Sequence, residues 1–538
     1  MKNPIYVIGH KNPDTDSIVS AIAYAQYLKH KKINAVASRI GSTNSETEFL
    51  LERFGFDEPK KLYTARSLLK EIEMDKPTLI TKDITMKEAL DIVLKRKNRS
   101  AIVIDKDKKI EGVISLSDLT YMWTKTDEEL EKIVKEIEID NIVKTLQGKT
   151  VVKGQHKLSG KLHIFPSLKS RVEKDSIVLL RNEDDKIEYC LNHGAVLLVV
   201  VTSSPISKNV IKMTKEKNAI IITTTLSPLS VTRLIYQTPT IEHVMQKKEK
   251  LVCFDDDETV QDVSKKIIKS RHRSYPVIND EGRVVGAISR YHLFNYQKKR
   301  FILVDHNEYK QTINDIEDGE IVEIVDHHRF GGFETENPIN VITKPVGSTS
   351  SIIAKMYIDN KIPLSKEMAG LLLGGIISDT INLNSPTTTK EDIEIVKILE
   401  KKSGVKANLL SKQMVEHSES ILSKRNIEIV YDDFKEFNID GVKVGLSQTS
   451  CKSKEEYDAI KNDLQLYLDD ACKSGMYELM AIMLTNPNGS GSYVMYAGNK
   501  KYLLDNIFVS KTNDNYVKGL VSRKKQLLPQ VIKAIGEQ

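Results

Sequence analysis

Cysteine is scarce in this sequence, and long apolar segments are missing from it. The four cysteines show neither CxxC spacing nor a dense framework, which excludes a cysteine-rich zinc module and suits a reducing compartment. No stretch reaches the roughly 18 apolar residues of a membrane helix, and no long apolar run precedes the first charged loop. We therefore expect a cytoplasmic protein that does not contact a membrane.

A strong excess of one charge is also missing. The 80 basic and 74 acidic residues leave a net charge of +6, which over a large surface does not argue for a nucleic-acid partner. The composition, 40% hydrophobic and 29% charged, is that of a globular protein. The length of 538 residues is enough for about three or four domains.

Apolar runs alternate with segments of helical periodicity. Residues 5–8 are apolar and precede the polar loop GHKNPDTDS, which leads into a helical pattern. The runs in 301–308 and 321–328 also end in Asp and His. This alternation predicts an α/β fold with a parallel sheet, in which ligands collect beyond the carboxyl ends of the strands.

The loops after these runs carry metal-binding side chains. Carboxylates with a few imidazoles suit Mn²⁺, Co²⁺ or Mg²⁺. Four carboxylates would nearly neutralise two divalent ions, leaving the pair free to bind and ionise a bridging water. An alternative for Asp14 or Asp16 is that it only caps the helix beginning near Ser17. The candidate side chains are His10, Asp14, Asp16, Asp305, Asp326, His327, His328 and Asp379.

An internal repeat lies between the first run and the later ones. Residues 83–119 align without gaps to 257–293, an offset of 174 residues (257 − 83 = 174). Each unit is predicted to form helix, strand, turn, strand, helix. The residues between them, about 121–240, contain apolar strand-like runs separated by helical sequence, so we expect a domain there and not a linker.

The repeats, with an acidic Gly turn followed by GVISLSDL or GAISRYHL, resemble cystathionine-β-synthase (CBS) domains. The segment between them resembles a DRTGG domain, although the literal motif is absent. The resemblance implies a paired module with clefts for adenosine nucleotides, in which Asp118 binds ribose and Tyr275 is a candidate to stack on adenine. His292 replaces the aspartate in the second repeat, so the two clefts are unequal. The alternative for these residues is ordinary exposed polar surface. The cleft residues implied are Arg99, Ser100, Ser115, Asp118, Arg273, Ser274, Tyr275 and Ser289.

The ordered set GHKNPDTD, VDH and DHH resembles the DHH superfamily and, within it, the family II inorganic pyrophosphatases, over about 1–65 and 298–538. The resemblance implies two Mn²⁺ or Co²⁺ ions, with additional Mg²⁺ arriving with the substrate. It places His10 and Asp14 on one ion and Asp16 and His327 on the other. Asp305 and Asp379 are shared or complete the ligand sets, and Asp326 orients an imidazole. His328 is a donor or general acid near the leaving phosphate.

The C-terminal segment VSRKKQLLPQ supplies positive charge. The resemblance implies that Arg523 and Lys524 clamp the phosphates and that Lys435 is a further substrate-binding lysine, roles that suit a planar guanidinium and a point charge. Lys525 is expected to point elsewhere, and Gln311 to lie near the site. Without that context, such a basic run is more often solvated surface.

The family resemblance implies nucleotide-regulated hydrolysis of pyrophosphate in a homodimer whose modules pair. It also implies that AMP and ADP inhibit and that ATP or diadenosine polyphosphates activate. One alternative is a DHH-type phosphodiesterase acting on short or cyclic oligonucleotides, but its glycine-rich GGGH motif is absent from the sequence. Another is a catalytically silent nucleotide sensor, against which the complete ligand set argues. The expected domains are 1–65 with 298–420 (catalytic), 66–125 (first CBS repeat), 126–240 (DRTGG-like), 241–297 (second CBS repeat) and 425–538 (substrate-binding).

Overall fold

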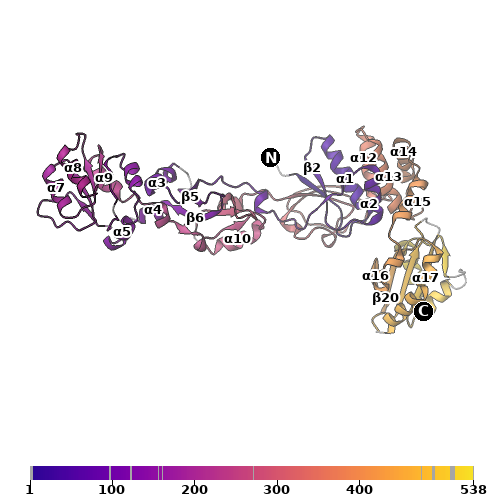
Figure 1. Cartoon of the computed structure of the whole chain (residues 1–538). Coiled ribbons are helices and arrows are strands. Elements are labelled where there is room, and N and C mark those ends of the chain that lie inside the picture. Colours follow the sequence, from indigo (N-terminus) through magenta and orange to yellow (C-terminus); the bar gives the residue numbers. More distant parts are fainter. Residues whose placement is uncertain are drawn as a thin grey trace. The chain divides into compact units, whose positions relative to one another are not determined.

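The chain divides into two compact units, drawn as ribbons in the computed structural model of Figure 1. One unit is discontinuous and combines Met1–Ser67 with Gln297–Gln538, whereas the inserted unit is Leu68–Tyr296. Among the described residues, no helix has both the length and the apolar character needed to cross a membrane. The structure describes residues 4–95, 99–121, 124–155, 157–159, 161–270, 272–473, 475–487, 491–508 and 515–536.

A six-stranded parallel sheet begins the discontinuous unit. Its order is β18-β17-β16-β1-β2-β3, so β1 from before the insertion pairs directly with β16 from after it, and Val7 lies opposite Ile302. Apolar clusters cover both faces, which explains why these strands are apolar without alternation. The predicted parallel α/β fold is confirmed. The strands are β1 (Ile5–Ile8), β2 (Ala35–Arg39), β3 (Lys60–Lys61), β16 (Arg300–Val304), β17 (Glu320–Asp326) and β18 (Asn340–Thr343).

Helix α13 (Lys366–Asp379) is the central helix beside this sheet. It is apolar on every side because its residues from Met368 to Ile377 are all buried. Gly374 lets α2 pack closely, since a Cβ there would lie 2.6 Å from a methyl carbon of Leu50. The helices packed around it are α1 (Thr15–His30), α2 (Ser45–Phe54), α12 (Thr349–Asp359), α14 (Lys390–Ser403) and α15 (Ala407–His417).

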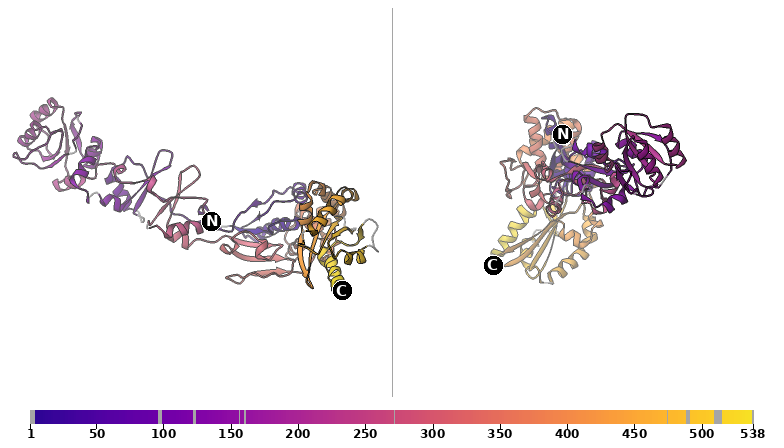
Figure 2. Two further views of the ribbon diagram at one scale, coloured as in Figure 1. Left: turned by 90° about the horizontal axis from the view of Figure 1, so that it is seen from below. Right: turned by 90° about the vertical axis from the view of Figure 1, so that its left-hand side faces the viewer.

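The C-terminal part of this unit has its own sheet, in the order β19-β20-β21-β22-β23. Alternate residues of β21 face opposite sides: Ile482 packs with Leu464 of α17, and Met483 packs with Val531 of α19. Helices therefore cover both faces, as the right-hand view of Figure 2 shows. The elements are α16 (Asn426–Tyr431), β19 (Phe434–Ile439), β20 (Val442–Ser450), α17 (Lys454–Lys473), β21 (Leu479–Thr485), β22 (Gly491–Ala497), α18 (Tyr502–Phe508), β23 (Tyr516–Lys518), η8 (Arg523–Leu527) and α19 (Leu528–Gly536).

The inserted unit contains the α/β domain expected between the repeats. Its sheet has the order β7-β11-β10-β9-β8, and β8 to β11 run parallel. The fully apolar β10 is buried in the middle, as expected for a central parallel strand. The elements are α5 (Asp127–Val134), α6 (Ile139–Thr145), β7 (Lys149–Val152), β8 (Leu162–Ile164), β9 (Ile177–Arg181), α7 (Asp184–Asn192), β10 (Leu197–Val201), α8 (Lys208–Glu216), β11 (Ile220–Thr224) and α9 (Pro228–Ile235).

Both repeats have the predicted order of helix, strand, turn, strand, helix, which is confirmed. In each, the two strands of the repeat pair antiparallel. Apolar residues of the two repeats also meet in one cluster, which joins them into a module. The first repeat comprises β4 (Leu79–Ile80), α3 (Met86–Leu94), β5 (Ser100–Ile104), β6 (Ile110–Ser115) and α4 (Leu116–Tyr121). The second comprises β13 (Phe254–Asp255), α10 (Val260–Ile268), β14 (Tyr275–Ile278), β15 (Val284–Ile288) and α11 (Arg290–Phe294).

The segments that precede the two repeats are exchanged. Leu69 of η1 (Leu69–Glu71) lies in the core of the second repeat, next to Phe254. Ile241 of η3 (Ile241–His243) lies in the core of the first repeat instead. A linear division of the chain at about 66 and 241 does not show this crossover, because each leading segment completes the other repeat.

Candidate functional site

The loop between β1 and α1, together with the first turn of α1, holds three of the predicted ligands, His10, Asp14 and Asp16. Asp14 is the N-cap of α1, because its Oδ1 accepts a hydrogen bond from the Ser17 backbone N–H at 2.9 Å. Its Oδ2 lies 3.4 Å from His10 Nε2. The capping and ligand interpretations are therefore compatible, since each uses a different oxygen. Gly9 makes the loop possible, because a Cβ there would lie 1.9 Å from Ser17 Oγ, which accepts the His10 N–H.

Asp305 lies directly after β16 and faces two histidines. Its Oδ2 is 3.5 Å from His10 Nε2, and its Oδ1 is 3.5 Å from His327 Nε2. The side chain is 2% exposed, and its backbone has φ of 62°, a left-handed conformation that is unusual for a residue other than glycine. Asp305 therefore presents one carboxylate oxygen to each of the two histidines.

Asp16 is held by the N-terminus of α12. Its Oδ2 accepts the Thr349 N–H at 2.7 Å, and its Oδ1 accepts the Ser350 N–H at 3.0 Å. Thr349 Oγ1 also donates to Asp305 Oδ1 at 2.9 Å, so one residue holds two carboxylates. Sequence reasoning missed Thr349 and Ser350. The only signal was GSTSS before a helix, which ordinarily indicates a cap.

His327 presents one ring nitrogen to the site. Its Nδ1 lies 3.0 Å from the Val346 carbonyl oxygen, to which it donates, so the lone pair of Nε2 faces inward. That Nε2 lies 3.2 Å from Asp379 Oδ2. Both atoms are buried without a hydrogen-bond partner among the described residues. Two buried acceptors facing each other fit a cation between them.

The buried carboxylates carry excess negative charge. Burial and the negative charge of Asp305 raise the pKa of Asp16 to about 7. Burial also raises the pKa of Asp379 well above its usual range, although the nearby His327 opposes this. Carboxylates that resist ionisation in this way indicate a site built for positive charge.

The neighbouring carboxylates raise the pKa values of the two histidines against the effect of burial. Burial would lower the pKa of His10, but Asp14 and Asp305 outweigh it and raise the value to about 11. For His327, burial is likewise outweighed by Asp379 and Asp305, and the pKa is raised to about 9. The same carboxylates that favour a proton on each ring would favour a cation bound to its nitrogen.

Three groups of side chains have ligand atoms within 4.8 Å of one another. Asp305 belongs to two of the groups and His327 also to two, so the groups form one continuous cluster. All six predicted metal ligands are brought together. The groups are His10, Asp14 and Asp305; Asp16, His327 and Asp379; and Asp305, His327 and His328.

His328 is oriented by Asp326. Asp326 Oδ1 accepts the backbone N–H of His328 at 3.1 Å and lies 2.9 Å from His328 Nδ1. Asn307, which sequence reasoning missed, donates to the other oxygen of Asp326 at 2.5 Å and so holds the carboxylate. Asp326 is fully buried, whereas 53% of the His328 side chain is exposed. The far edge of this imidazole is therefore open to a ligand.

The predicted phosphate clamp lies in the C-terminal part. Arg523 and Lys524 begin η8, and Lys435 is on β19. The guanidinium of Arg523 donates to the Asp433 carbonyl oxygen, and its Nη1 lies 3.1 Å from Asp433 Oδ1. No hydrogen bond or ion pair within the described parts of the chain joins the three residues to the carboxylate cluster. Lys525 does point elsewhere, because its Nζ donates to the Pro386 carbonyl oxygen at 3.2 Å.

Gln448, another residue that sequence reasoning missed, positions the basic segment. Its Oε1 accepts the Arg523 backbone N–H at 2.9 Å. Its Nε2 donates to the Val521 carbonyl oxygen and to Thr485 Oγ1, both at 3.0 Å. Gln311 contacts the loop that carries His10 through its backbone, since its carbonyl oxygen accepts the Lys11 N–H at 2.6 Å.

In the first repeat, Asp118 closes the N-terminus of α4. Its Oδ2 accepts both the backbone N–H and the hydroxyl of Ser115, at 2.8 and 2.6 Å. Arg99 is exposed with φ of 47°, and its carbonyl oxygen accepts the Leu116 N–H. Ser100 is half-buried at the start of β5. These four predicted residues thus surround one end of the β5–β6 hairpin.

In the second repeat, His292 takes the place of Asp118. Its Nδ1 accepts the Ser289 backbone N–H at 3.0 Å. Arg273 is exposed and Ser274 is half-buried. Tyr275 differs from the expectation: its ring is fully buried beside Phe254, and its hydroxyl donates to the His272 carbonyl oxygen. Tyr275 therefore belongs to the core and is not placed to stack on a base, because it points to the inner face of β14.

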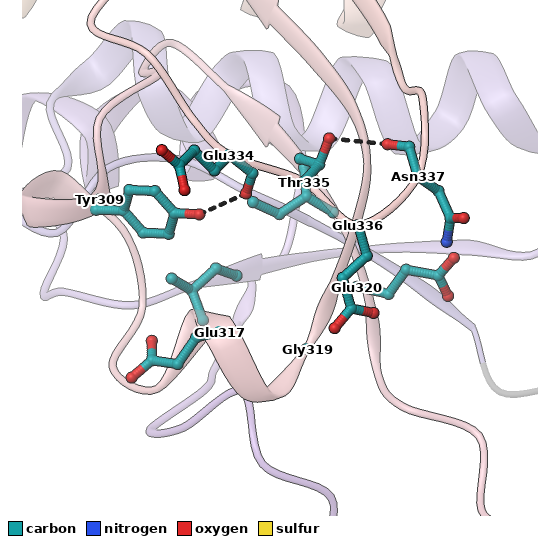
Figure 3. A pocket seen from close by; sticks show the side chains of 10 residues that line it. Tyr309, Glu317, Gly319, Glu320, Glu334, Thr335, Glu336 and Asn337 are labelled. Atoms are coloured by element: carbon teal, nitrogen blue, oxygen red, sulfur yellow. Dashed lines mark hydrogen bonds between the residues drawn. The ribbon is translucent and has the colours of Figure 1, made fainter.

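A separate cavity of about 380 Å³ lies at the opposite end of β17 from Asp326 (Figure 3). Its lining is strongly acidic, and Tyr309 donates to the Glu334 carbonyl oxygen across it at 2.6 Å. Such a lining repels an anionic substrate. The acidic residues are Glu317, Glu320, Glu334 and Glu336.

Comparison with known proteins gives two family matches. Residues 4–146 and 179–376 match the DHH family, N-terminal domain, and residues 412–534 match the DHHA2 domain. Over 544 residues the chain is 33% identical to the "Cobalt-dependent inorganic pyrophosphatase" of Clostridium perfringens, with 99% of both chains covered.

Two further similarities extend over long segments. The chain is 30% identical over 545 residues to the "Probable manganese-dependent inorganic pyrophosphatase" of Thermotoga maritima, covering 98% and 97% of the two chains. A crystal structure of the CBS and DRTGG domains of the regulatory region of Clostridium perfringens pyrophosphatase, complexed with the activator diadenosine tetraphosphate, covers 42% of this chain and 100% of that one. Its sequence identity is 26% and its TM-score is 0.38.

Proposed function

This chain belongs to the inorganic pyrophosphatases of the DHH family, and we propose that it cleaves pyrophosphate at the cluster centred on Asp305, under the control of adenine nucleotides bound by the inserted unit. The observation that carries the proposal is the position of Asp305, which presents one oxygen to His10 and the other to His327. A residue in that position can serve two cation sites at once.

The metal sites divide along the two sides of Asp305. His10 and Asp14 would hold one Co²⁺ or Mn²⁺ ion, and Asp16, His327 and Asp379 the other. Bound divalent ions neutralise the carboxylates and lower the pKa of the attacking water. The protein contributes rigid placement, because the α12 N-terminus fixes Asp16 and the Val346 carbonyl fixes the His327 ring.

The remaining residues act on the phosphates. The half-exposed His328, held by Asp326, is placed to donate a proton or hydrogen bond to the leaving phosphate. Arg523, Lys524 and Lys435 would supply positive charge to a substrate that arrives with Mg²⁺. The contacts of Arg523 with Asp433 use Nη1, and a guanidinium has further N–H donors for a phosphate.

The test compares phosphate release from pyrophosphate and from a dinucleotide, with Mn²⁺ or Co²⁺ present. Asp305→Asn should lose most pyrophosphate hydrolysis, at least about a hundredfold, because it removes the shared charge. Asp359→Asn, on the outer surface of α12 beside Lys355, is the matched control and should stay active. Full turnover by Asp305→Asn would refute the two-metal assignment. Preferred cleavage of the dinucleotide would favour a phosphodiesterase.

The connection between the inserted unit and β16 supports the regulatory part of the proposal. The inserted unit ends at Tyr296, and the chain then enters β16, whose end carries Asp305. A nucleotide can change the rate only if it binds two states of the enzyme with different affinity. We expect AMP and ADP to inhibit and ATP or diadenosine polyphosphates to activate, in a homodimer. Initial rates with each nucleotide and sedimentation of the free enzyme test this, and unchanged rates would refute the regulatory part alone.

A further inference from the structure

We propose that the inserted unit has two ribose-binding clefts, and that Asp75 supplies in the second cleft the carboxylate that Asp118 supplies in the first. The proposal rests on the proposed binding of adenine nucleotides. It identifies a ligand group that the repeat alone does not predict, since Asp75 lies outside both aligned segments.

The two clefts are related by the 174-residue offset. Asp118 and His292 are equivalent in sequence and also in structure, because each accepts the backbone N–H of a serine three residues earlier. The second repeat thus keeps the cap but lacks a carboxylate at this position. A carboxylate accepts hydrogen bonds from ribose hydroxyls. Because His292 Nδ1 already accepts the Ser289 N–H, its Nε2 carries the proton and does not accept as Asp118 can.

The exchanged leading segments supply a carboxylate to the second cleft, which lacks one at the position of His292. In the first repeat, Gln246 pairs with Val113 of β6, and its side chain donates to Asp118 Oδ1 at 3.4 Å. In the second repeat, Asp75 pairs with Ala287, which is equivalent to Val113. Asp75 and Gln246 therefore occupy matching positions beside the two caps.

Close packing supports the same correspondence. A Cβ on Gly112 would lie 3.1 Å from Met245 Sδ, and a Cβ on the equivalent Gly286 would lie 2.8 Å from Met74 Sδ. These two methionines directly precede Gln246 and Asp75. The leading segments also begin alike, because Thr240 bridges to Thr85 and Leu68 bridges to the equivalent Thr259.

The two clefts consequently hold the same pair of positions with different chemistry. The first has an aspartate on the repeat and an amide on the leading segment. The second has a histidine on the repeat and an aspartate on the leading segment, with His292 Nε2 3.6 Å from Asp75 Oδ1. Two hydrogen bonds, at 3.0 and 3.1 Å, fix the Asp75 backbone to Ala287, while 45% of its side chain is exposed. The backbone of Asp75 is therefore held in place, while its carboxylate is accessible from solvent.

Calorimetric titration of the full chain with AMP tests the assignment. We expect two sites per chain, with Asp75→Asn weakening one and Asp118→Asn weakening the other, each by about 10- to 100-fold, as for loss of a hydrogen bond to a charged group. Asp91→Asn, an exposed α3 residue paired with Lys87, is the matched control and should bind like the unchanged protein.

A reconstruction variant makes the test sharper. Asp118→His should weaken the first cleft, and adding Gln246→Asp to it recreates the second cleft in the first and should recover binding at least about tenfold. Equal AMP binding by Asp75→Asn and the unchanged protein, or a single site that Asp118→Asn removes, would overturn the assignment of Asp75. No AMP binding by the unchanged protein would instead overturn the proposed regulation, so the two failures are distinguishable.

Discussion

Thr349 offers the most direct test of how the protein builds the metal centre. Its hydroxyl donates to Asp305 Oδ1 at 2.9 Å, and its backbone N–H donates to Asp16 Oδ2 at 2.7 Å. The residue is fully buried, so water cannot replace a lost hydrogen bond. Thr349→Val removes only the hydroxyl while keeping the volume and the backbone contact.

The size of the effect follows from the charge on the acceptor. A buried hydrogen bond to a charged group contributes about 1.5–3 kcal/mol, which corresponds to roughly a 10- to 150-fold change in an equilibrium constant. Partners of metal ligands have effects of about this size, 10- to 100-fold, on metal affinity. We therefore expect the Mn²⁺ concentration for half-maximal activity to rise by about that factor.

The assay is phosphate release titrated with free Mn²⁺ in a metal buffer, after chelation. Thr349→Ser keeps the hydroxyl and is the matched control, for which we expect a change of less than about threefold. Near-normal turnover at saturating Mn²⁺ would show that Thr349 positions Asp305 and does not act on the substrate. An identical metal dependence in the Val and Ser variants would refute the reasoning.

Three further predictions concern the same unit. Chelation should lower Tm, because Mn²⁺ at about 100 times its Kd stabilises a protein by about 2.7 kcal/mol, and a scanning-fluorimetry curve that EDTA leaves unchanged would contradict the cluster. In EDTA the Tm should also fall as pH rises from about 5 to 8, because the folded pKa of Asp16 is raised to about 7 and that of His327 to about 9; the folded state then holds protons that the unfolded state releases. Gln448→Ala should raise KM for pyrophosphate about tenfold more than it lowers kcat, since it frees the Arg523 segment, and a change in kcat alone would argue against that role.

The predicted ligands could be recognised because each follows an apolar run. Asp305 and His327 come directly after buried parallel strands, and the carboxyl ends of such strands meet at one edge. Their partners gave no comparable signal. Asp16 is held by the backbone N–H groups of Thr349 and Ser350, more than three hundred positions away, and sequence periodicity does not report such contacts.

Two residues of the inserted unit pack differently from what the sequence predicted, and each difference has a local cause. Tyr275 begins β14 and Ser274 directly precedes it, and a one-residue shift decides which side chain enters the core. The alignment of the repeats identified Ser274 and Tyr275 as candidates. It did not indicate that the Tyr275 ring faces inward against Phe254. Likewise, the expected boundary at residue 66 assigned Leu69 to the first repeat, whereas Leu69 packs in the core of the second.

The exchange of leading segments also decides where the inserted unit begins and ends. Leu69, just after the first crossing between units, and Tyr296, just before the return, both pack in the core of the second repeat. An insertion whose ends are held together disturbs its host little. It also leaves only the short linkers from β3 into the insertion and from the insertion into β16, which cost less entropy to close than a long flexible loop. Without the crossover, Leu69 would pack in the first repeat while Tyr296 stays in the second, so the two ends of the insertion would belong to different repeats. Loosening Leu69 in its pocket should therefore slow assembly of the catalytic sheet, even though no catalytic residue is touched.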